Sequence, residues 1–367
     1  MITNIRIKNF KALRDIDLHT SNLNVFTGLN GMGKSTILQA LLLLRQSKKN
    51  GFEELILNDD IELGTFRDVL CESRTKDRTL SFELIWKDES QLKIQRTYEN
   101  DLGEEKVLKG EPISNDFSKK ALFGEASFKY LSAHRIKPQD RYGTHSTKVK
   151  LGQLGNEGEY APHYYHLNYD KNISIKELAF KDEDTVFSLE YQVNRWLSVI
   201  SPKISVHTES KDGKLIQLTY SYTIEKYGSS TSKFSPKNAG FGLTYVFSVL
   251  VALLSAKKGD IIIIENPESH IHPKGQTELA RLMALAAKNG VQIFCETHSD
   301  HIVYGSRIAI KEREIRNEDV KIYYIDRDKN EHFSDAHWIE IDEYGRMERR
   351  VRKYFREFEL HLNKLMS

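Results

Sequence analysis

The chain has 367 residues, of which 39% are hydrophobic and 29% charged, and its 54 Lys and Arg residues nearly balance its 52 Asp and Glu residues. This composition is typical of a soluble globular protein with several subdomains, and alone it indicates neither a nucleic-acid partner nor a membrane partner. The N-terminus has no apolar signal region, and the longest apolar run, near residues 246–254, is too short to cross a bilayer, so we expect a cytoplasmic protein.

The first elements form a strand, a loop and a helix. LNVFT, at residues 23–27, has the pattern of a short apolar strand, and the apolar residues after position 35 have that of a helix. Between them lies a complete G-x-x-x-x-G-K-[ST] loop, Gly28-Leu29-Asn30-Gly31-Met32-Gly33-Lys34-Ser35-Thr36. Its glycines let backbone N–H groups turn toward phosphates. The loop therefore predicts a nucleotide site.

Within this loop, Lys34 is expected to reach the β- and γ-phosphates and Ser35 to ligate Mg²⁺. We expect ATP and Mg²⁺ as cofactors, although no residue can be assigned to the base, which leaves GTP open. The predicted nucleotide-binding residues of the loop are Asn30, Gly31, Met32, Gly33, Lys34, Ser35 and Thr36.

The middle of the chain is less regular. Residues 55–110 contain strand-like stretches separated by charged turns, which predict an antiparallel arm. A buried strand is expected at 127–133, a helix near 190–199 and strands at 203–208 and 214–225. Residues 135–180 show no clear periodicity, and we expect loops and short elements there.

Two further apolar strands end in polar residues. Ile261 to Ile264 are followed by Glu265, which fits the carboxylate that holds the Mg²⁺ shell, so Ser35 and Glu265 are the predicted metal residues. VQIFCETHSDH reads as a strand ending at Glu296, Thr297 and His298, and such a histidine can donate to the γ-phosphate or orient the attacking water. Strands that alternate with helices here favour a parallel sheet with its ligands at the carboxyl ends of the strands.

The order of GLNGMGKST, KNAGFG, IIIIENPESHIHP and ETHSDH resembles the ABC-type P-loop ATPase heads of the SMC and OLD (overcoming lysogenization defect) group. The resemblance covers about residues 1–310 and is closest to compact stand-alone bacterial ATPases of anti-phage defence operons. It implies an α/β fold with a mixed or parallel central sheet, an antiparallel β subdomain and a helical signature subdomain, without a long coiled coil. It also implies a head-to-head dimer that encloses two ATP molecules.

In that family the segment IKNFK lies close to the nucleotide, which implies a role for Lys11. The signature motif at the start of a helix faces ATP bound by the second subunit, which here implies Asn238, Gly240 and Gly242. From the residues alone, the same segment also reads as a plain helix start with Asn238 as its N-cap. The family's glutamine loop has two candidates, Gln139 and Gln153, and the spacing selects neither.

The chain departs from the family where catalysis is concerned. ABC heads usually carry Asp and then Glu after the acidic strand, with the second residue as general base, whereas this chain has Glu265 and then Asn266. Because an amide cannot take a proton from water, we expect slow hydrolysis with Glu268 assisting. Glu265 serving in both roles is the alternative. The predicted catalytic residues are thus Glu265, Glu268 and His298.

We predict four regions. Residues 1–135 form a first ATPase lobe with the P-loop and the antiparallel arm, and residues 136–235 form the intervening part of a second lobe. Residues 236–310 hold the signature helix, the acidic strand and the histidine strand, and residues 311–367 a strand and a basic amphipathic helix. That helix reads either as a solvated face or as a surface for nucleic acid or a partner. Its basic residues are Arg349, Arg350, Arg352, Lys353 and Arg356.

The predicted function is a slow Mg²⁺-dependent ATPase that forms a homodimer or a higher even oligomer. It regulates or positions a separate effector protein in bacterial anti-phage defence, with nucleic acid as a further possible partner and no membrane partner. One alternative is a nucleotide-gated binding module that does not hydrolyse ATP. Another is an ATPase of DNA repair or chromosome maintenance that binds duplex DNA.

Overall fold

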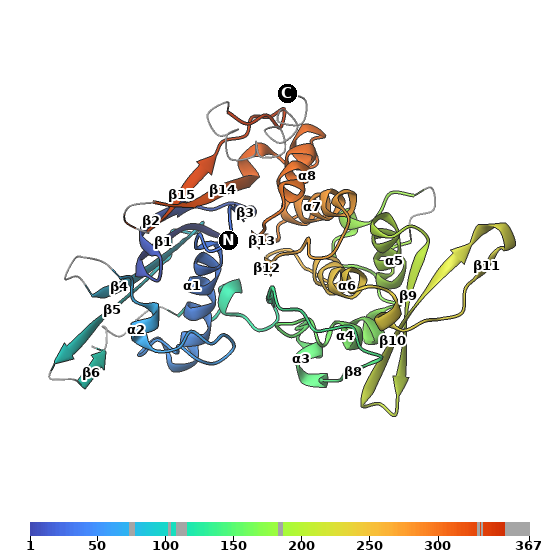
Figure 1. Ribbon diagram of the computed structural model, residues 1–367, viewed down its shortest axis with the longest axis horizontal. Helices are drawn as coiled ribbons and strands as arrows, with labels where there is room; N and C mark the ends of the chain where they lie inside the picture. The colour runs from blue at the N-terminus through green and yellow to red at the C-terminus, as the bar shows by residue number, and fades with distance from the viewer. Residues whose placement is uncertain are drawn as a thin grey trace, which may run out of the picture.

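A six-stranded sheet forms the centre of the protein (Figure 1). The computed structural model describes residues 1–72, 78–101, 104–107, 116–182, 186–328, 331 and 333–348. The strands of the central sheet, in spatial order, are β15 (Ser334–Ile339), β14 (Val320–Arg327), β3 (Leu23–Thr27), β13 (Gln292–Glu296), β12 (Ile261–Glu265) and β7 (Phe128–Leu131). All pairs are parallel except β15 with β14.

The strands β3, β13 and β12 are buried along their whole length, which explains apolar runs such as the four isoleucines of β12. Ile261 and Ile263 belong to the hydrophobic core on the side of α1 (Lys34–Ser47). Ile262 and Ile264 belong to the core on the other side. Because side chains alternate along a strand, Glu265 shares the face of Ile263 and Ile261. The end of β12 therefore places its carboxylate on the same face of the sheet as α1.

A second sheet packs against α1 on the side that faces away from the central sheet. It is antiparallel, in the order β2 (Leu13–His19), β1 (Ile2–Phe10), β4 (Thr79–Trp86), β5 (Gln91–Asp101) and β6 (Glu104–Val107). Leu41 to Leu44 are almost fully buried, since α1 lies in the same core as residues of both sheets. A helix between two sheets needs apolar residues all round, which accounts for this run of leucines.

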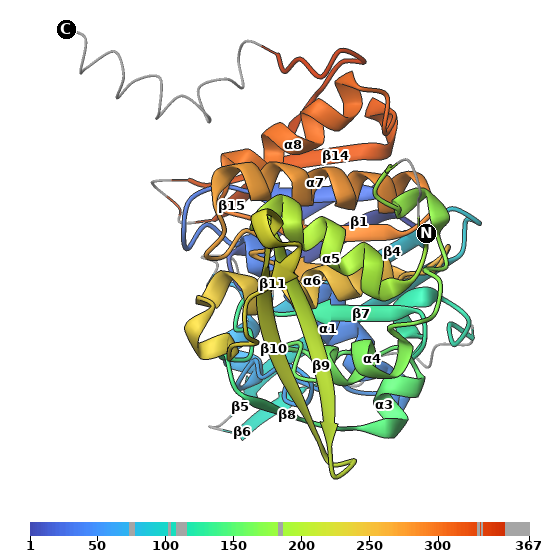
Figure 2. The same cartoon turned by 90° about the vertical axis from the view of Figure 1, so that its right-hand side faces the viewer.

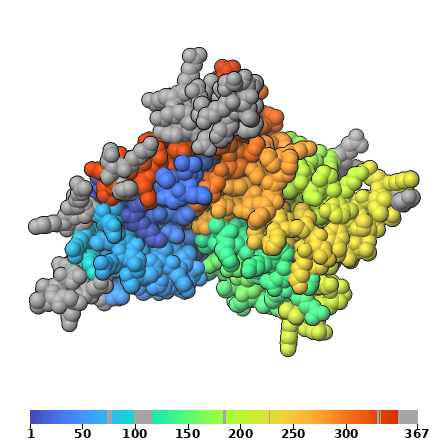
Figure 3. Space-filling view, in the orientation of Figure 1, coloured from blue at the N-terminus to red at the C-terminus, as the bar shows by residue number. Residues whose placement is uncertain are grey.

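The opposite face of the central sheet carries the second lobe (Figure 2). Its core contains residues of α4 (Ala161–Asn168), α5 (Leu189–Ile200), α6 (Phe241–Leu254), α7 (Pro273–Lys288) and α8 (Asp300–Lys311). A long hairpin of β9 (Ile204–Lys211) and β10 (Leu215–Ile224) extends from it, and β10 also pairs with β8 (Arg141–Gly143) and β11 (Ser229–Ser230). In the space-filling view this lobe lies beside the first lobe (Figure 3).

The remaining helices are short. They are α2 (Phe66–Val69), α3 (Ser146–Lys150), η1 (Lys48–Asn50), η2 (Ala121–Phe123), η3 (Lys176–Leu178), η4 (Glu225–Tyr227), η5 (Pro236–Asn238) and η6 (Asn317–Asp319).

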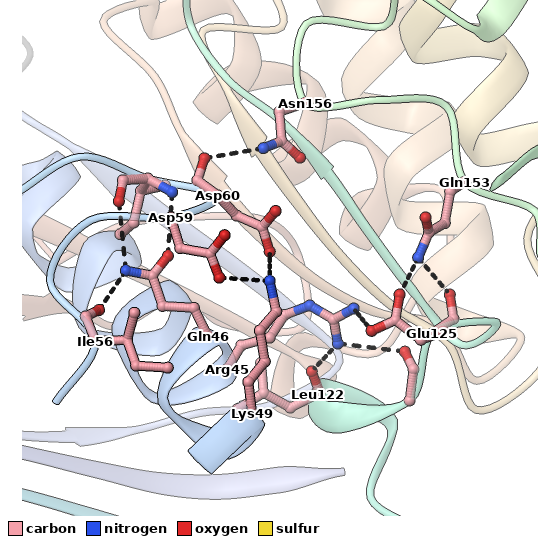
Figure 4. Close-up of polar contacts among 12 residues, drawn as sticks. Arg45, Gln46, Lys49, Ile56, Asp59, Asp60, Leu122, Glu125, Gln153 and Asn156 are labelled. Atoms are coloured by element: carbon pink, nitrogen blue, oxygen red, sulfur yellow. Dashed lines mark hydrogen bonds and ion pairs between the residues drawn. The ribbon is translucent and has the colours of Figure 1, made fainter. Parts of the chain in front are cut away.

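A polar network joins the C-terminal end of α1 to the segment on either side of β7 (Figure 4). Arg45 donates to the carbonyl of Leu122 (2.6 Å) and to Glu125 (3.1 Å), and Gln153 donates to the same carboxylate. Asn156 donates to the carbonyl of Asp60 at 3.0 Å. These contacts cross from the first lobe to the loop that leads into the second, so they couple the positions of the two lobes.

The predicted fold class is confirmed: the central sheet is mixed and almost all parallel, the arm is antiparallel, and α6 begins a helical region. Among the described residues the longest helix is α7, with 16 residues, so this part of the chain contains no long coiled coil. No described helix is long and apolar enough to cross a membrane. The segment 135–180 contains β8, α3 and α4. The predicted basic C-terminal helix lies outside the described residues, and the four predicted domain boundaries stay predictions.

Candidate nucleotide site

The phosphate-binding loop connects β3 to α1, as its sequence context predicts. Gly33 is the N-cap of α1 with φ 95°, and no side chain caps the helix. The first N–H groups of α1 are therefore free to bind an anion. Gly28 has φ 140°, and a Cβ at this position would lie 2.2 Å from the carbonyl oxygen of Ile325 on β14. Only glycine lets the loop pass this strand so closely.

The loop borders a cavity at the carboxyl ends of β3, β13 and β14. The lining residues are Lys11, Ala12, Asn30, Gly31, Gly33, Lys34, Ser35, Thr36, Gln39, Asp68, Glu296, His298 and Arg327. The cavity thus contains every predicted nucleotide-binding residue except Met32, which packs against the core around α1. Basic side chains on several sides make it suited to a polyphosphate.

Lys34 lies inside the loop. Its Nζ donates to the carbonyl oxygens of Gly28 (2.8 Å) and Leu29 (2.7 Å). Burial lowers the pKa of Lys34, while the negative charges of Glu296 and Glu268 oppose this shift. The ammonium is therefore held at the cavity wall with carboxylates nearby.

Glu265 and Glu296 stand side by side at the ends of neighbouring parallel strands, where they are paired in register. The Ser35 hydroxyl donates to Oε1 of Glu296 at 2.8 Å. Glu265 accepts from the backbone N–H of Ala133 at 2.9 Å and from the hydroxyl of Tyr130 at 3.1 Å. The predicted metal residue Ser35 therefore contacts Glu296, while Glu265 is turned toward β7.

Burial, followed by the neighbouring charge of Glu265, raises the pKa of Glu296 to about 7. Burial also raises the pKa of Glu265, opposed by the hydrogen bonds from Ala133 and Tyr130. Two carboxyl groups so close together and so little solvated resist being charged at the same time. A cation between them and the phosphates would relieve this repulsion.

The side chain of Glu268 is hydrogen-bonded to the backbone of His298. Oε1 of Glu268 accepts from the backbone N–H of His298 at 2.8 Å, while Oε2 is buried and has no partner among the described residues. Burial raises the pKa of Glu268. Burial and the charge of Lys34 lower the pKa of His298. Glu268 thus fixes the strand end that brings a neutral imidazole to the cavity.

Arg135 supplies a second buried positive charge. Its side chain donates to the carbonyl oxygens of Glu265 (2.9 Å) and Ser132. Burial lowers the pKa of Arg135 to about 10, with Glu265 and Glu268 opposing the shift. The sequence places Arg135 just after a strand but gives no motif that assigns it this role.

Five further cavity residues were not predicted: Ala12, Gln39, Asp68, Glu296 and Arg327. Gln39 accepts from Lys11 Nζ at 2.8 Å. Nε of Arg327 is buried without a partner in the described part of the chain. Arg327 ends β14, so the rule that ligands bind at the carboxyl ends of parallel strands was a usable signal for it. Asp68 has no such signal.

The glutamine-loop candidates lie elsewhere. The side chain of Gln153 bonds to Glu125 in the network of Figure 4, and Gln139 bonds through its backbone N–H to the Tyr142 hydroxyl at 3.1 Å. Neither lines the cavity around the phosphate-binding loop.

The predicted signature residues lie at the start of α6 and do not line this cavity. Asn238 ends η5, and the N-cap of α6 is Gly240 with φ 80°, so the alternative of Asn238 as its N-cap is wrong. A Cβ on Gly242 would lie 2.2 Å from the carbonyl oxygen of His270. Between these glycines, Phe241 is 54% exposed. The start of α6 is thus a surface that one chain leaves uncovered.

The fold and the site together define a P-loop ATPase head. Residues 23–304 match the family model described as "AAA domain, putative AbiEii toxin, Type IV TA system", and because the match covers well over half of the chain, the protein belongs to this family. No curated protein sequence matches the chain.

Solved structures of SMC heads are similar in fold. The SMC head bound to the C-terminal winged-helix domain of ScpA has 12% identity and a TM-score of 0.57, covering 92% of this chain and 98% of that one. An SMC head with an extended coiled coil, bound to the C-terminal domain of ScpA from Pyrococcus furiosus, has 12% identity and a TM-score of 0.51, covering 98% of each chain. At this identity the likeness shows the fold alone, and it agrees with the predicted SMC-type head.

Proposed function

We propose that the protein binds Mg-ATP in this cavity and hydrolyses it slowly within a head-to-head homodimer. The observation that carries the proposal is the meeting of an uncapped glycine-rich helix start, Lys34, Ser35 and buried carboxylates at one edge of a parallel sheet. The N–H groups of the helix start would bind phosphates, Lys34 would bind the β- and γ-phosphates, and the side-chain oxygens would ligate Mg²⁺.

The residues fit this cofactor. Among the described residues, no group of three or more His, Cys, Asp and Glu side chains is arranged to hold a metal. The contact of the Ser35 hydroxyl with the carboxylate of Glu296 suits Mg²⁺, which usually takes one or two protein ligands and completes its shell with phosphates and water. Lys11 and Arg327 add positive charge to the same cavity. When bound, the ion would neutralise phosphate charge that develops during hydrolysis.

The position of α6 supports the proposed dimer. Its exposed start carries Asn238, Gly240 and Phe241 outside the cavity of its own chain. An exposed helix start with a glycine N-cap can bind an anion, and a second copy placed face to face would bring its ATP there. A symmetric pair of such contacts closes after two chains.

Slow turnover is the expected result of Asn266. It follows Glu265 directly, has φ 45°, and donates its backbone N–H to the carbonyl of Glu296 at 2.8 Å. Its amide oxygen is buried without a partner among the described residues. In the proposed mechanism His298 orients the attacking water, and Glu268 assists while positioning His298. If Glu268 does not assist, Asn266 favours the second candidate function, a nucleotide-gated binding module that hardly hydrolyses ATP.

We further propose that the head controls a separate effector in bacterial anti-phage defence. The support is the family description, which names an AbiEii toxin of type IV toxin–antitoxin systems. The related SMC heads, for their part, are solved with ScpA domains bound.

Two measurements test the proposal. Titration calorimetry with ATP and Mg²⁺ should show binding that Lys34→Ala abolishes, and light scattering should show ATP-dependent doubling of the mass. ATP binding without any change of mass would refute the dimer while leaving the nucleotide site in place.

A further inference from the structure

A second buried carboxylate, that of Glu296, lies beside Glu265 at the end of the neighbouring strand. The acidic strand β12 ends in Glu265 and then Asn266, so it provides only one acid at the usual place. The sheet order inserts β13 between β12 and the P-loop strand β3. The final residue of β13 is Glu296, and it is therefore one strand closer to the phosphate-binding loop than Glu265.

The side chain of Glu296 lies on the face of the sheet that packs against α1. Phe294, two residues earlier on the same strand, belongs to the core around α1, and alternation places Glu296 on that face as well. Glu296 lines the cavity together with Lys34 and Ser35, whereas Glu265 does not line it.

The contact with Ser35 has the spacing of two metal ligands. Ser35 Oγ and Glu296 Oε1 are 2.8 Å apart. Neighbouring oxygens of an octahedral Mg²⁺ with bonds of about 2.1 Å are about 3 Å apart. An ion could thus take both oxygens with little movement of either side chain.

The two glutamates differ in how much of each is already engaged. Both oxygens of Glu265 accept a hydrogen bond, one from Tyr130 and one from Ala133. In the described part of the chain, Ser35 is the only hydrogen-bond donor found for Glu296. Glu296 therefore keeps an oxygen that can bind a cation, while the carboxylate of Glu265 is held by Tyr130 and Ala133.

We propose that Glu296, rather than Glu265, is the carboxylate that holds the Mg²⁺ of bound ATP together with Ser35. This inference rests on the proposed function, because it needs ATP in the cavity. It gives Glu265 the role of holding β7 and Arg135 in place, and it makes the strand between the P-loop strand and the acidic strand the metal-binding strand.

The test measures Mn²⁺ binding to the protein–ATP complex by electron paramagnetic resonance, and ATP binding in EDTA by calorimetry. Glu296→Gln keeps an oxygen that can accept from Ser35 but removes the charge. We expect it to weaken Mn²⁺ binding at least 10-fold without weakening metal-free ATP binding, because it removes a negative charge from the cavity that receives the phosphates. Glu265→Gln is the matched control on the neighbouring strand and should weaken Mn²⁺ binding by less than 3-fold.

A double-variant cycle adds an independent readout. If Ser35 and Glu296 hold the same ion, Ser35→Ala combined with Glu296→Gln should lose less free energy of Mn²⁺ binding than the sum of the two single losses. Should Glu296→Gln not fold, Glu296→Asp keeps the charge on a shorter side chain, and its Mn²⁺ affinity should still fall more than that of Glu265→Gln.

The outcomes separate this inference from the proposed function. Unchanged Mn²⁺ affinity in the Glu296 variants, or a larger loss in Glu265→Gln, would overturn the role of Glu296 while ATP binding stands. A wild-type protein that binds no ATP would overturn both.

Discussion

Glu265 and Glu296 are paired in register at the ends of two parallel strands, and only Glu296 reaches the hydroxyl of Ser35. Two acidic side chains are thus buried beside a phosphate-binding loop, with Lys34 and Arg135 as the nearby positive charges. This arrangement is costly for the chain alone and favourable with a cation, as expected of a site built for Mg-ATP.

The free-energy cost of burying these carboxylates should make the stability of the protein depend on pH. The pKa of Glu296 is raised to about 7, from an ordinary value of 4.5, by burial and by Glu265. The folded chain therefore holds a proton that the unfolded chain has released, and the stability contributed by this group falls as pH rises from about 5 to about 7. In EDTA and at pH 8, we expect Glu296→Gln to be more stable than the wild type. Its free energy of unfolding should be higher by on the order of 2 kcal/mol.

Chemical denaturation at pH 5 and pH 8 checks this prediction. The advantage of Glu296→Gln should shrink toward pH 5, and Glu177→Gln, at an exposed position, should show no such trend. A wild type that is more stable than Glu296→Gln at pH 8 would contradict the raised pKa.

Gly242 should matter for packing. A Cβ there would lie 2.2 Å from the His270 carbonyl oxygen, so Gly242→Ala must push the start of α6 away from the loop after β12. Crowding of this kind costs about 1–3 kcal/mol. Gly143→Ala, where nothing lies within 4 Å of the added Cβ, is the control. Equal melting temperatures of the two variants would show that the loop yields without cost.

Phe241 should matter for dimerisation. It is 54% exposed, and its ring lies near those of Tyr245 and His270. Since aromatic residues often dominate interfaces, Phe241→Ala should weaken the ATP-bound dimer at least 5-fold, equivalent to about 1 kcal/mol, with little change in monomer stability. Analytical ultracentrifugation with ATP measures this. Tyr344→Ala, at 57% exposure on the turn after β15, should leave the dimer unchanged. A dimer that Phe241→Ala leaves unchanged would place the interface elsewhere.

Asn266 should limit hydrolysis. Asn266→Glu puts a base after Glu265, and because a positioned general base typically gives 100-fold or more, we expect kcat to rise by roughly 10-fold or more despite the positive φ. Asn266→Gln, with an amide of the same length, should not be faster than the wild type. If Asn266→Glu is no faster either, the wild type already has a base.

Glu268 is the candidate for that base. If it assists hydrolysis, Glu268→Gln should lower kcat while ATP affinity changes little, and an unchanged rate would remove Glu268 from the mechanism. His298 offers a comparison, because Glu268 accepts the hydrogen bond from its backbone. His298→Ala should lower kcat in either case.

The elements that a short local sequence pattern marks could be predicted from the sequence. The phosphate-binding loop, β12 and β13 were recognisable because a motif or an apolar run of few residues marks each of them. The fold class followed from the alternation of strands and helices. The irregular segment before α5 gave no clear pattern, because β8 is only three residues long and pairs with β10, more than 70 residues further along the chain.

The site was less predictable than the fold, since it depends on which strands become neighbours. Glu296 was visible as a strand end, but no local pattern shows that β13 lies next to β3 and brings it to Ser35. Arg327 and Asp68 likewise reach the cavity from distant segments. Sequence motifs alone therefore assigned the metal to Glu265, and the tertiary contacts point to its neighbour.

The most direct test of the proposed function is the rate of Mg-ATP hydrolysis per molecule, measured over a wide range of protein concentration. A site completed by a second chain predicts that this specific rate rises with concentration and then levels off once the dimer is saturated. A specific rate that stays constant and above background would contradict the head-to-head mechanism. A rate at background throughout, with ATP still bound, would show that the protein is a nucleotide switch and not an ATPase.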